Sequence, residues 1–566
     1  MRGDRGNDRG GRCLKIYVLA VSALGVAGSA HGYTFPTEGG GWTFNADTSL
    51  QYTLGVRAQG RDDNIGNHPF YAEGDYKFNP GNVVTDRIQA IEELQAVYKA
   101  NDGFRLSGSA WKDFAYDDKV VTNPNPAFST FLSYPSGTYS AYTQKYTIQG
   151  GELLDAFAFD NSNIGDTKLY SKVGRFTQYW GNAFLFGFSN IAYSQHPVDY
   201  IKGFSQPGSE VKELFLPRAQ ILETAEFSPQ VSLSAQYFLQ FRANRYPQGG
   251  TYLGPFDILY EGPTSGGALA GSFGGPVSAG NVDAPKNING NFGVKLTWSP
   301  SWAHGDMSFY YRVLDEVQPW PLADIGATGG GRLHLSYAQH VNLYGFSYER
   351  TFGLISTGYE FSYRQHTALA SALTNGIPGV PTSEGAKGDI ANVIANAFVQ
   401  LGSTPLYDTG ILIAEATYTS LVSLDSKNAA LYSGVGHPGC PTNNKWDGCA
   451  TSQALALGFI FEPQWLQVFP SIDLSMPSSY TWGVTGNPAY AAGAFYAQGT
   501  NIYSLGIKAT YKATNTLTLA YNGYNWRRGP TTVIPGLGQS YAGFGGNGPV
   551  ALDDKGWVSL TIKTSF

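Results

Sequence analysis

Apolar and polar residues alternate in many short segments of this chain. In Val231–Phe241 the apolar residues share one face, namely Val231, Leu233, Ala235, Tyr237, Leu239 and Phe241. The last eleven residues, 556–566, place Val558, Leu560, Ile562 and Phe566 on one face and Ser559, Thr561, Lys563 and Ser565 on the other. A period of two with one apolar face is typical of a β-strand that meets water on one side only.

Eighteen segments follow this pattern. They are 42–58, 86–100, 104–116, 151–159, 168–180, 219–227, 231–241, 289–298, 305–312, 338–349, 353–364, 391–401, 409–422, 450–461, 468–479, 503–511, 517–524 and 556–566. The gaps between them alternate: those at 101–103, 160–167, 228–230, 299–304, 350–352, 402–408, 462–467 and 513–516 are short, and the intervening ones are long.

Short turns on one side and long loops on the other are the rule in bacterial transmembrane barrels, with both termini on the short-turn side. The pattern therefore predicts an all-β protein, a transmembrane antiparallel β-barrel of about 18 strands. One misread hairpin would reduce the count to 16. The predicted location is the bacterial outer membrane, with outer-membrane lipid around the barrel.

Composition agrees with a single barrel. Aromatic residues make up 14% of the chain and charged residues only 14%, against roughly 25% charged in soluble domains. The 71 Gly and 37 Tyr suit many turns and two aromatic girdles. Beyond the N-terminal region, no apolar stretch reaches the ~18 residues that a spanning helix needs. No linker divides the chain, so residues 33–566 are predicted to form one barrel domain.

The N-terminal region resembles a secretory signal. Five basic residues, Arg2, Arg5, Arg9, Arg12 and Lys15, precede an apolar run over 16–27 and then small residues. We predict a signal peptide over residues 1–32, with cleavage after Ala30 as the alternative.

Charge and cysteine content narrow the chemistry. Without residues 1–32, which hold five basic and two acidic residues, Lys plus Arg falls from 37 to 32 and Asp plus Glu from 43 to 41, a formal charge of −9. This balance argues against nucleic acid as a partner. Cys440 and Cys449 lie nine residues apart in a turn-rich segment, which favours a loop disulfide. A metal site is the weaker interpretation, because two thiols and one nearby His are few ligands.

The connection over residues 181–218 has an unusual composition for an outer loop. Its many apolar residues include Phe184, Phe186 and Phe188, and they would form a costly exposed patch in water. We therefore predict that it folds into the barrel as a plug or constriction, with a short helix beginning near Ser209. The candidate residues of this plug are Phe184, Phe186, Phe188, His196, Asp199, Lys202, Glu210, Lys212, Glu213 and Arg218.

Two roles remain open for the charged members of this segment: pairing with the lumen walls, which we favour, or direct contact with a ligand. The imidazole of His196, with Asp199 nearby in the sequence, could titrate near neutral pH. A hydrogen-bonded structural His is the more common state. Polar residues elsewhere suggest a wet interior. The candidate lumen-facing residues are Gln236, Gln240, Arg242, Lys508 and Lys512.

Two motifs in and before this segment resemble a known family. VGRFTQYWGN over Val173–Asn182 and HPVDYIKGFSQPGSEVKELFLPRAQI over His196–Ile221 resemble the core of the proteobacterial family called domain of unknown function 1302, together with a closing strand that ends in Phe. The resemblance extends over essentially the whole mature chain. Asn182, His196 and Thr564 depart from the family pattern, where an acid, an Asn and an aromatic residue are usual.

The resemblance implies an outer-membrane barrel that accompanies a periplasmic lipid-carrier-like protein and an inner-membrane transporter of the resistance-nodulation-division type. It also implies a hydrophobic cargo, such as a lipid, steroid, terpenoid or aromatic compound. These expectations rest on analogy with the family.

Enzymatic motifs are absent from the sequence. It contains no G-x-S-x-G, no Walker loop, no H-E-x-x-H spacing and no cofactor motif. The Gly-rich run at 262–280 lacks the Lys-Ser/Thr ending of a phosphate loop and is predicted to be a flexible outer loop. The sequence thus favours a channel for hydrophobic small molecules over an enzyme. The alternative is a surface receptor or adhesin whose lumen is blocked.

Overall fold

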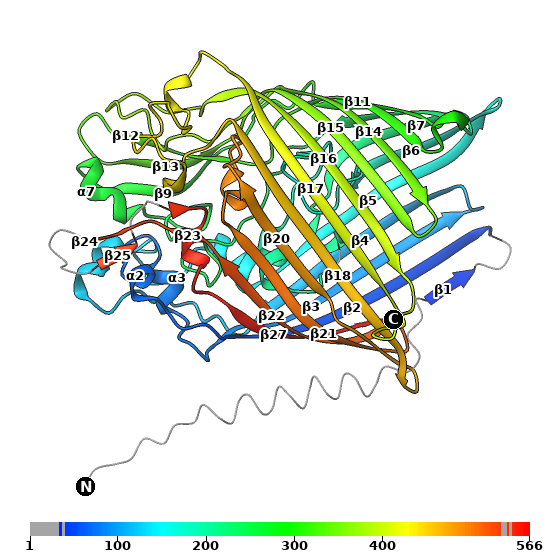
Figure 1. The fold of residues 1–566 in the computed structure, drawn as a ribbon, viewed down its shortest axis with the longest axis horizontal. Coiled ribbons are helices and arrows are strands. Elements are labelled where there is room, and N and C mark those ends of the chain that lie inside the picture. Colours follow the sequence, from blue (N-terminus) through cyan, green and yellow to red (C-terminus); the bar gives the residue numbers. More distant parts are fainter. Residues whose placement is uncertain (1–32, 37–39, 210, 534–539, 543–545) are drawn as a thin grey trace, which may run out of the picture.

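The computed structural model describes residues 33–36, 40–209, 211–533, 540–542 and 546–566, and in it the chain forms a closed antiparallel β-barrel of 18 strands (Figure 1). The wall consists of β2 (Trp42–Arg57), β3 (Val83–Tyr98), β4 (Asp102–Asp113), β5 (Gln149–Ile164), β6 (Thr167–Phe176), β7 (Arg218–Ser228), β8 (Val231–Phe238), β10 (Phe292–Trp298), β11 (Asp306–Leu314), β14 (Val341–Phe352), β15 (Ile355–Ala368), β16 (Lys387–Leu401), β17 (Thr409–Leu424), β18 (Gln453–Phe469), β19 (Ile472–Ser475) with β20 (Ser478–Thr485), β21 (Asn501–Tyr511), β22 (Asn515–Asn525) and β27 (Trp557–Ser565). The predicted fold class and strand number are confirmed.

Closure is made by the first and last wall strands. β2 pairs with β27 from Ser49↔Ser565 to Arg57↔Trp557, and its other edge pairs with β3. A further strand, β1 (Tyr33–Pro36), pairs with Thr43–Ala46 of β2. β19 and β20 act as one strand, because both lie between β18 and β21 and are separated only by Met476 and Pro477. Proline cannot donate to a ladder, which accounts for the interruption.

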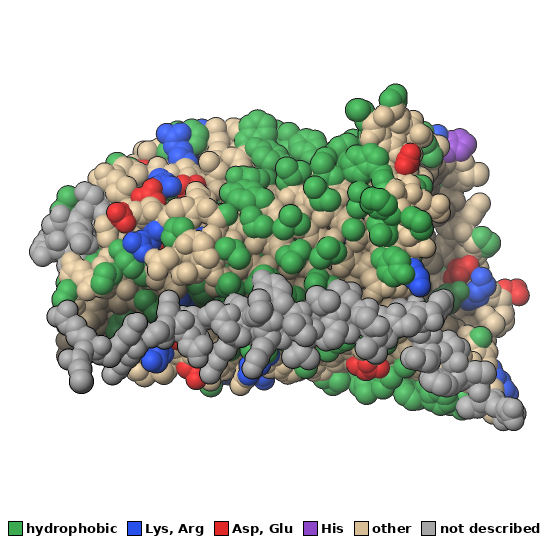
Figure 2. Space-filling view, turned by 90° about the horizontal axis from the view of Figure 1, so that it is seen from below, with side chains coloured by type: hydrophobic (Ala, Val, Ile, Leu, Met, Phe, Trp, Pro, Cys, Tyr) green, Lys and Arg blue, Asp and Glu red, His purple; other side chains and the backbone are tan. Residues whose placement is uncertain are grey.

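Side chains alternate between the two faces of the wall. On β16, Ile390, Asn392 and Ile394 are buried, whereas Val393 between them is 47% exposed on the outer face. Outward apolar residues occur on most strands, for example Ile88, Phe104, Phe361, Tyr418, Trp482 and Leu519. Figure 2 shows apolar side chains across the middle of the outer face, with most charged side chains toward the ends. This is the apolar band that a barrel presents to lipid.

Short and long connections separate cleanly. Turns such as 165–166 and 353–354 join strands at one end, where Gly165 and Gly353 adopt left-handed φ values of 59° and 60°. The long connections lie at the opposite end, away from the C-terminus (Figure 1). The predicted alternation of connection lengths is confirmed. The predicted signal peptide, residues 1–32, lies outside the described residues.

The long connections contain short elements of their own. The helices among them are α2 (Asp63–Gly66), α3 (Ala72–Tyr76), α4 (Ala141–Thr143) and α7 (Ala270–Phe273), and a small sheet contains β9 (Val277–Asp283), β12 (Trp320–Ile325) and β13 (Gly331–Ser336). Among the described residues, no helix is long and apolar enough to cross a membrane.

These connections pack on one another to form an outer lid, which we define as residues 58–82, 114–148, 239–291, 315–340, 526–533, 540–542 and 546–556. Their buried apolar residues share one cluster, which includes Ile65, Phe70, Tyr71, Tyr252, Leu253, Ile258, Val277, Leu333, Trp526 and Leu552. Burial of this kind requires fixed positions, so the long-loop end of the barrel is covered by a packed layer.

Polar groups are also buried in the outer lid. Asp257 accepts hydrogen bonds from the backbone N–H groups of Glu73 (2.8 Å) and Gly74 (3.3 Å). Burial raises the pKa of Asp257 to about 7, and burial together with the neighbouring Asp257 raises the pKa of Glu73. Two acidic groups from different loops, Glu73 and Asp257, therefore lie buried beside each other.

Two sequence predictions of detail are wrong. The turn predicted at 462–467 lies at 470–471, because β18 continues through Pro463 to Phe469. Residues 262–280 are not merely a flexible loop: they include α7 and the start of β9, which pairs with β13, and Val277 is 4% exposed. The small Gly and Ala side chains of this run allow close packing between loops.

Candidate functional site

The inner segment, which we define as residues 177–209 and 211–217 between β6 and β7, lies inside the barrel. It contains α5 (Tyr200–Ser205) and α6 (Val211–Leu214), so the predicted short helix after Ser209 is confirmed. Phe186, Ile191 and Ile201 are buried, with at most 4% of each exposed. Burial removes about 1.5–3 kcal/mol of unfavourable hydration for each such side chain, which is why the segment folds inward rather than into water.

Two wall carboxylates hold the start of the inner segment. Glu360 on β15 accepts hydrogen bonds from the backbone N–H groups of Asn182, of Ala183 at 2.9 Å and of Ile191 at 2.9 Å. Glu415 on β17 accepts those of Phe184 (2.6 Å), Leu185 (2.9 Å) and Phe186 (2.9 Å). Successive N–H groups that converge on one anion form a strong, charge-assisted contact.

Wall arginines bind the carbonyl groups of the same segment. Arg312 on β11 donates from Nη1 to the carbonyl oxygens of Ile191 and Tyr193, both at 2.8 Å. Arg364 on β15 donates to Phe188 O at 2.9 Å and lies 3.9 Å over the Tyr193 ring. Carboxylates therefore bind backbone donors at the start of the inner segment, and guanidinium groups bind its backbone acceptors, so these buried groups have partners in the wall.

The opposite wall holds the far part of the segment. Glu152 on β5 forms ion pairs with Arg245 (2.7 Å), Arg242 (2.8 Å) and Lys202 (3.4 Å), and Arg245 also pairs with Asp199 at 3.1 Å. Asp199 additionally caps α5 through Lys202 N at 3.1 Å. One acid faces three cations here, and its own side chain is only 8% exposed.

A third contact reaches the closing strand. Glu213 of α6 pairs with Lys563 of β27 at 2.8 Å and accepts a hydrogen bond from Gln89 of β3 at 3.1 Å. The inner segment thus extends across the lumen, from β15 and β17 on one side to β3, β5 and β27 on the other.

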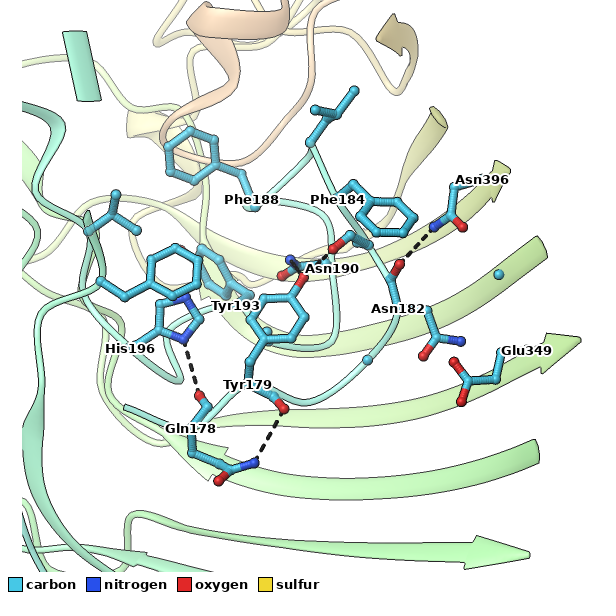
Figure 3. Close-up of a pocket in the computed structure, with 18 of the residues that line it drawn as sticks. Gln178, Tyr179, Asn182, Phe184, Phe188, Asn190, Tyr193, His196, Glu349 and Asn396 are labelled. Carbon is cyan, nitrogen blue, oxygen red and sulfur yellow. Dashed lines mark hydrogen bonds between the residues drawn. The ribbon is translucent and has the colours of Figure 1, made fainter. Parts of the chain in front are cut away.

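A cavity of about 1170 Å³ lies beside the inner segment (Figure 3). One wall is aromatic, with Tyr179, Phe184, Phe188, Tyr193, Tyr200, Phe215 and Tyr496 among its residues. The other wall belongs to β11, β14, β15 and β16, and the cavity reaches the short-turn end at His304 and Asp306. By contrast, the cavity that contacts the outer lid at Tyr116 and Tyr252 holds only about 30 Å³.

His196 lines this cavity as a neutral ring. Its ring centroid lies 3.7 Å from that of Phe215, and its Nδ1 is 3.2 Å from Gln178 O. A carbonyl oxygen only accepts, so Nδ1 carries the proton and Nε2 is an acceptor. Burial lowers the pKa of His196 to about 4. The structure therefore gives no support to a His196–Asp199 pair that titrates near neutrality, since Asp199 binds Arg245 instead.

The other predicted plug residues fall into three groups. Phe186, Phe188, Lys202, Glu213 and Arg218 are buried, and Arg218 is the first residue of β7, where Nη1 donates to Ser194 O at 3.1 Å. Phe184 is 51% exposed toward the cavity. Glu210 and the side chain of Lys212 lie outside what the structure describes.

The residues predicted to face the lumen differ in their surroundings. Gln236 is buried and binds Gln195 at 2.9 Å, Arg242 pairs with Glu152, and Lys508 pairs with Glu462 at 2.5 Å. Gln240 is exposed just beyond β8. Lys512 lies in the exposed turn between β21 and β22, with φ 51°, so its placement on a strand face is wrong. β21 ends at Tyr511, where the alternating segment also ends, so Lys512 lies just beyond the strand.

Cys440 and Cys449 form a disulfide in the loop between β17 and β18, with their Cα atoms 5.8 Å apart. Both residues are buried, at 3% and 4% exposure. They lie away from the cavity, whose lining contains neither.

Glu360, Glu415 and Glu152 were missed as site residues. Each is an acidic residue at an inward position of a strand whose outward neighbours are apolar, such as Tyr359 and Phe361 beside Glu360. That signal was present in the sequence. The sequence did not show what these acids bind, because the partners of Glu360 and Glu415 are backbone N–H groups, which carry no sequence signature.

A closed barrel with an apolar outer band, a polar interior and a segment folded across its lumen defines a porin-like outer-membrane β-barrel. The chain belongs to the family described as protein of unknown function (DUF1302), whose sequence profile matches residues 14–566.

Comparison with solved structures finds other outer-membrane proteins. Acinetobacter baumannii OccAB4 shares 9% identity at a TM-score of 0.42, covering 92% of this chain and 98% of that one. Pseudomonas aeruginosa OccD3 (OpdP) shares 12% at 0.41, covering 96% of each chain. Pseudomonas aeruginosa OpdK with vanillate shares 8% at 0.39, covering 92% and 98%. Among curated proteins there is no match.

Proposed function

We propose that this protein is an outer-membrane channel that moves hydrophobic small molecules, such as lipids, steroids, terpenoids or aromatic compounds. The observation that carries the proposal is the aromatic-walled cavity of about 1170 Å³ at the short-turn end of the barrel. Its volume suits a ligand of drug size or larger, and its apolar wall supplies a favourable surface for such a ligand.

The inner segment acts as a fixed constriction in this proposal. Wall groups bind its backbone at both sides of the lumen, so a ligand passes beside it rather than displacing it. The next barrier is the packed outer lid, which has to open for a ligand to pass.

The short-turn end faces the periplasm in barrels of this kind. We therefore propose that the cavity receives its ligand from, or delivers it to, a periplasmic lipid-carrier-like protein, which in turn works with an inner-membrane transporter of the resistance-nodulation-division type. These partners are expected from the family resemblance. Transport is favoured over catalysis, because His196 is held by a carbonyl oxygen and an aromatic ring rather than by a nucleophile.

The channel proposal can be tested by a substitution that fills part of the cavity. Gly187 lines it, and a Cβ added there meets nothing within 4 Å, so Gly187→Phe is expected to fold normally and narrow the cavity. In a strain that lacks the protein, the wild type should restore accumulation or efflux of labelled hydrophobic compounds and Gly187→Phe should not. Gly402→Phe is the matched control, because Gly402 is equally open but lies in a turn outside the cavity. Equal activity of all three proteins would contradict the proposal.

A second function is favoured by the outer lid. A packed layer of long loops over a narrow interior also suits a surface receptor or adhesin. In that case, Gly187→Phe leaves transport of labelled compounds unaffected, and loss of the protein abolishes binding of a partner at the cell surface.

A further inference from the structure

Two acidic residues face each other at the mouth of the cavity. Asp306 begins β11, Glu349 lies directly opposite it on β14, and both line the cavity. Neither carboxylate forms a hydrogen bond or ion pair with any residue in the described part of the chain. Directly opposed like charges destabilise a sheet, so folding alone does not explain this pair.

The nearby cations leave the mouth negative. Lys295 on β10 is close enough to interact electrostatically with both acids, and it offsets one of their two charges. Arg350 also borders the cavity, but it follows Glu349 on β14 and so points to the opposite face. There its guanidinium lies 4.3 Å over the ring of Phe352, which is 51% exposed. Apart from Arg350, the described lining contains no Lys or Arg.

The inner wall offers acceptors and aromatic faces. Asn190 is 4% exposed and lines the cavity, and its Oδ1 has no hydrogen-bond partner among the described residues. His196 presents Nε2 as an acceptor, as its Nδ1 contact with Gln178 O requires. The ring of Phe184, together with Tyr200 and Phe215, adds π-surfaces that attract cations.

We propose that this cavity selects amphipathic ligands that carry a protonated amine on an apolar body, and that it rejects carboxylates. The amine lies at the mouth against Asp306 and Glu349, and the apolar body lies along the aromatic wall. This inference rests on the proposed function, because it treats the cavity as the entrance of the path, and it narrows the class of compound that enters.

Three probes with the same ring system but different charge test whether the cavity prefers amines. Binding of 2-naphthylmethylamine, 2-naphthalenemethanol and 2-naphthoate to the purified protein in detergent, measured by calorimetry, compares a cation, a neutral compound and an anion on the same ring system. We expect the amine to bind about tenfold or more tightly than the carboxylate, with the alcohol between them, from one net charge at roughly 8 Å in a partly hydrated mouth.

Asp306→Asn combined with Glu349→Gln should reverse the preference for the amine, because Lys295 then leaves the mouth positive, and it should leave binding of the alcohol unchanged. Asp166→Asn is the control, because Asp166 is an exposed acid in the turn between β5 and β6, outside the cavity. Carboxylate binding equal to or tighter than amine binding overturns the inference, as does a preference that survives in the double variant.

The two proposals fail in different ways. If the alcohol binds but charge has no effect, only the selection is wrong, and the accumulation assay with Gly187→Phe still decides the channel function. If none of the probes binds, the inference is also overturned. If Gly187→Phe transports like the wild type, the channel proposal itself is wrong.

Discussion

Glu360 and Glu415 bind consecutive parts of one backbone stretch from two different strands. Glu360 accepts the N–H of Ala183 at 2.9 Å, and Glu415 accepts those of Phe184 at 2.6 Å and Leu185 at 2.9 Å. The start of the inner segment is therefore attached to the wall by its backbone, and its side chains remain free to form the cavity.

Neutralising these acids should loosen the inner segment. Glu360→Gln with Glu415→Gln replaces charge-assisted contacts, each contributing about 1.5–3 kcal/mol, with weaker ones. We expect faster amide exchange over residues 182–191 and a lower unfolding midpoint in urea, both measurable on the purified protein.

The control for this double variant is Glu384→Gln, since Glu384 pairs with exposed Lys427 in an outer loop and such pairs contribute about 0–1 kcal/mol. Unchanged exchange over residues 182–191 in the double variant would show that side-chain packing alone holds the segment.

Neutralising Glu152, which pairs with three cations, should lower the stability of the protein strongly. Glu152→Gln leaves Lys202, Arg242 and Arg245 close together with only Asp199 as a counter-charge. Loss of one partner of a buried ion pair costs about 3–5 kcal/mol. We expect a lower unfolding midpoint than wild type, partly restored by adding Arg242→Gln. A double variant that is no more stable than Glu152→Gln would contradict this account.

The outer lid should be more open at alkaline pH. The folded-state pKa of Asp257 is raised from the ordinary 3.8 to about 7, so the folded protein binds the extra proton and stability falls as pH rises toward and through 7. Between pH 6.5 and 8.5 the remaining loss is about 1 kcal/mol. Amide exchange in 250–262, corrected for the intrinsic rate, should therefore be about fivefold faster at pH 8.5.

Asp257→Asn should reduce this pH dependence, because the amide does not titrate. Glu73 and Asp554, whose pKa values burial also raises in this lid, should retain part of it. His68 lies in the same lid, but its pKa is lowered to about 3 and it is neutral at both pH values. A pH dependence in Asp257→Asn as large as in the wild type would assign the effect to another group.

Reduction of the disulfide should act locally. Closing a loop of about ten residues stabilises it by about 3 kcal/mol in the chain-entropy model. With dithiothreitol, we expect faster proteolysis within 425–452 and no change in the unfolding of the barrel. Cys440→Ser with Cys449→Ser should match the reduced wild type and be insensitive to the reductant. Global destabilisation would indicate that this loop supports the barrel as a whole.

The wall was predictable because each strand faces lipid on one side and the interior on the other. Alternation follows from that geometry, as Val393 between Ile390 and Ile394 illustrates. Boundaries were less predictable where alternation does not stop at the turn. β18 runs on through Pro463, and nothing in the pattern distinguishes that residue from a turn proline.

The outer lid and the cavity were not predictable in the same way. Residues such as Ile65, Tyr71 and Tyr252 are buried by contacts between loops far apart in the chain, so they follow no local period. The inner segment was predictable from its apolar content, but its attachment was not. In the sequence, Glu360 is only one acid at an inward strand position. Its contact with the backbone N–H of Ala183 exists only in the folded chain.

The seam of the barrel sets a practical limit on how the chain can be extended. Phe566 exchanges backbone hydrogen bonds with Thr48, and two positions further along β2, Ala46 is already paired with Tyr33. An affinity tag added after Phe566 would run directly into β1 and compete for the same edge. Purification handles and fluorophores therefore belong in exposed outer connections such as 376–381, where they leave the closing seam intact.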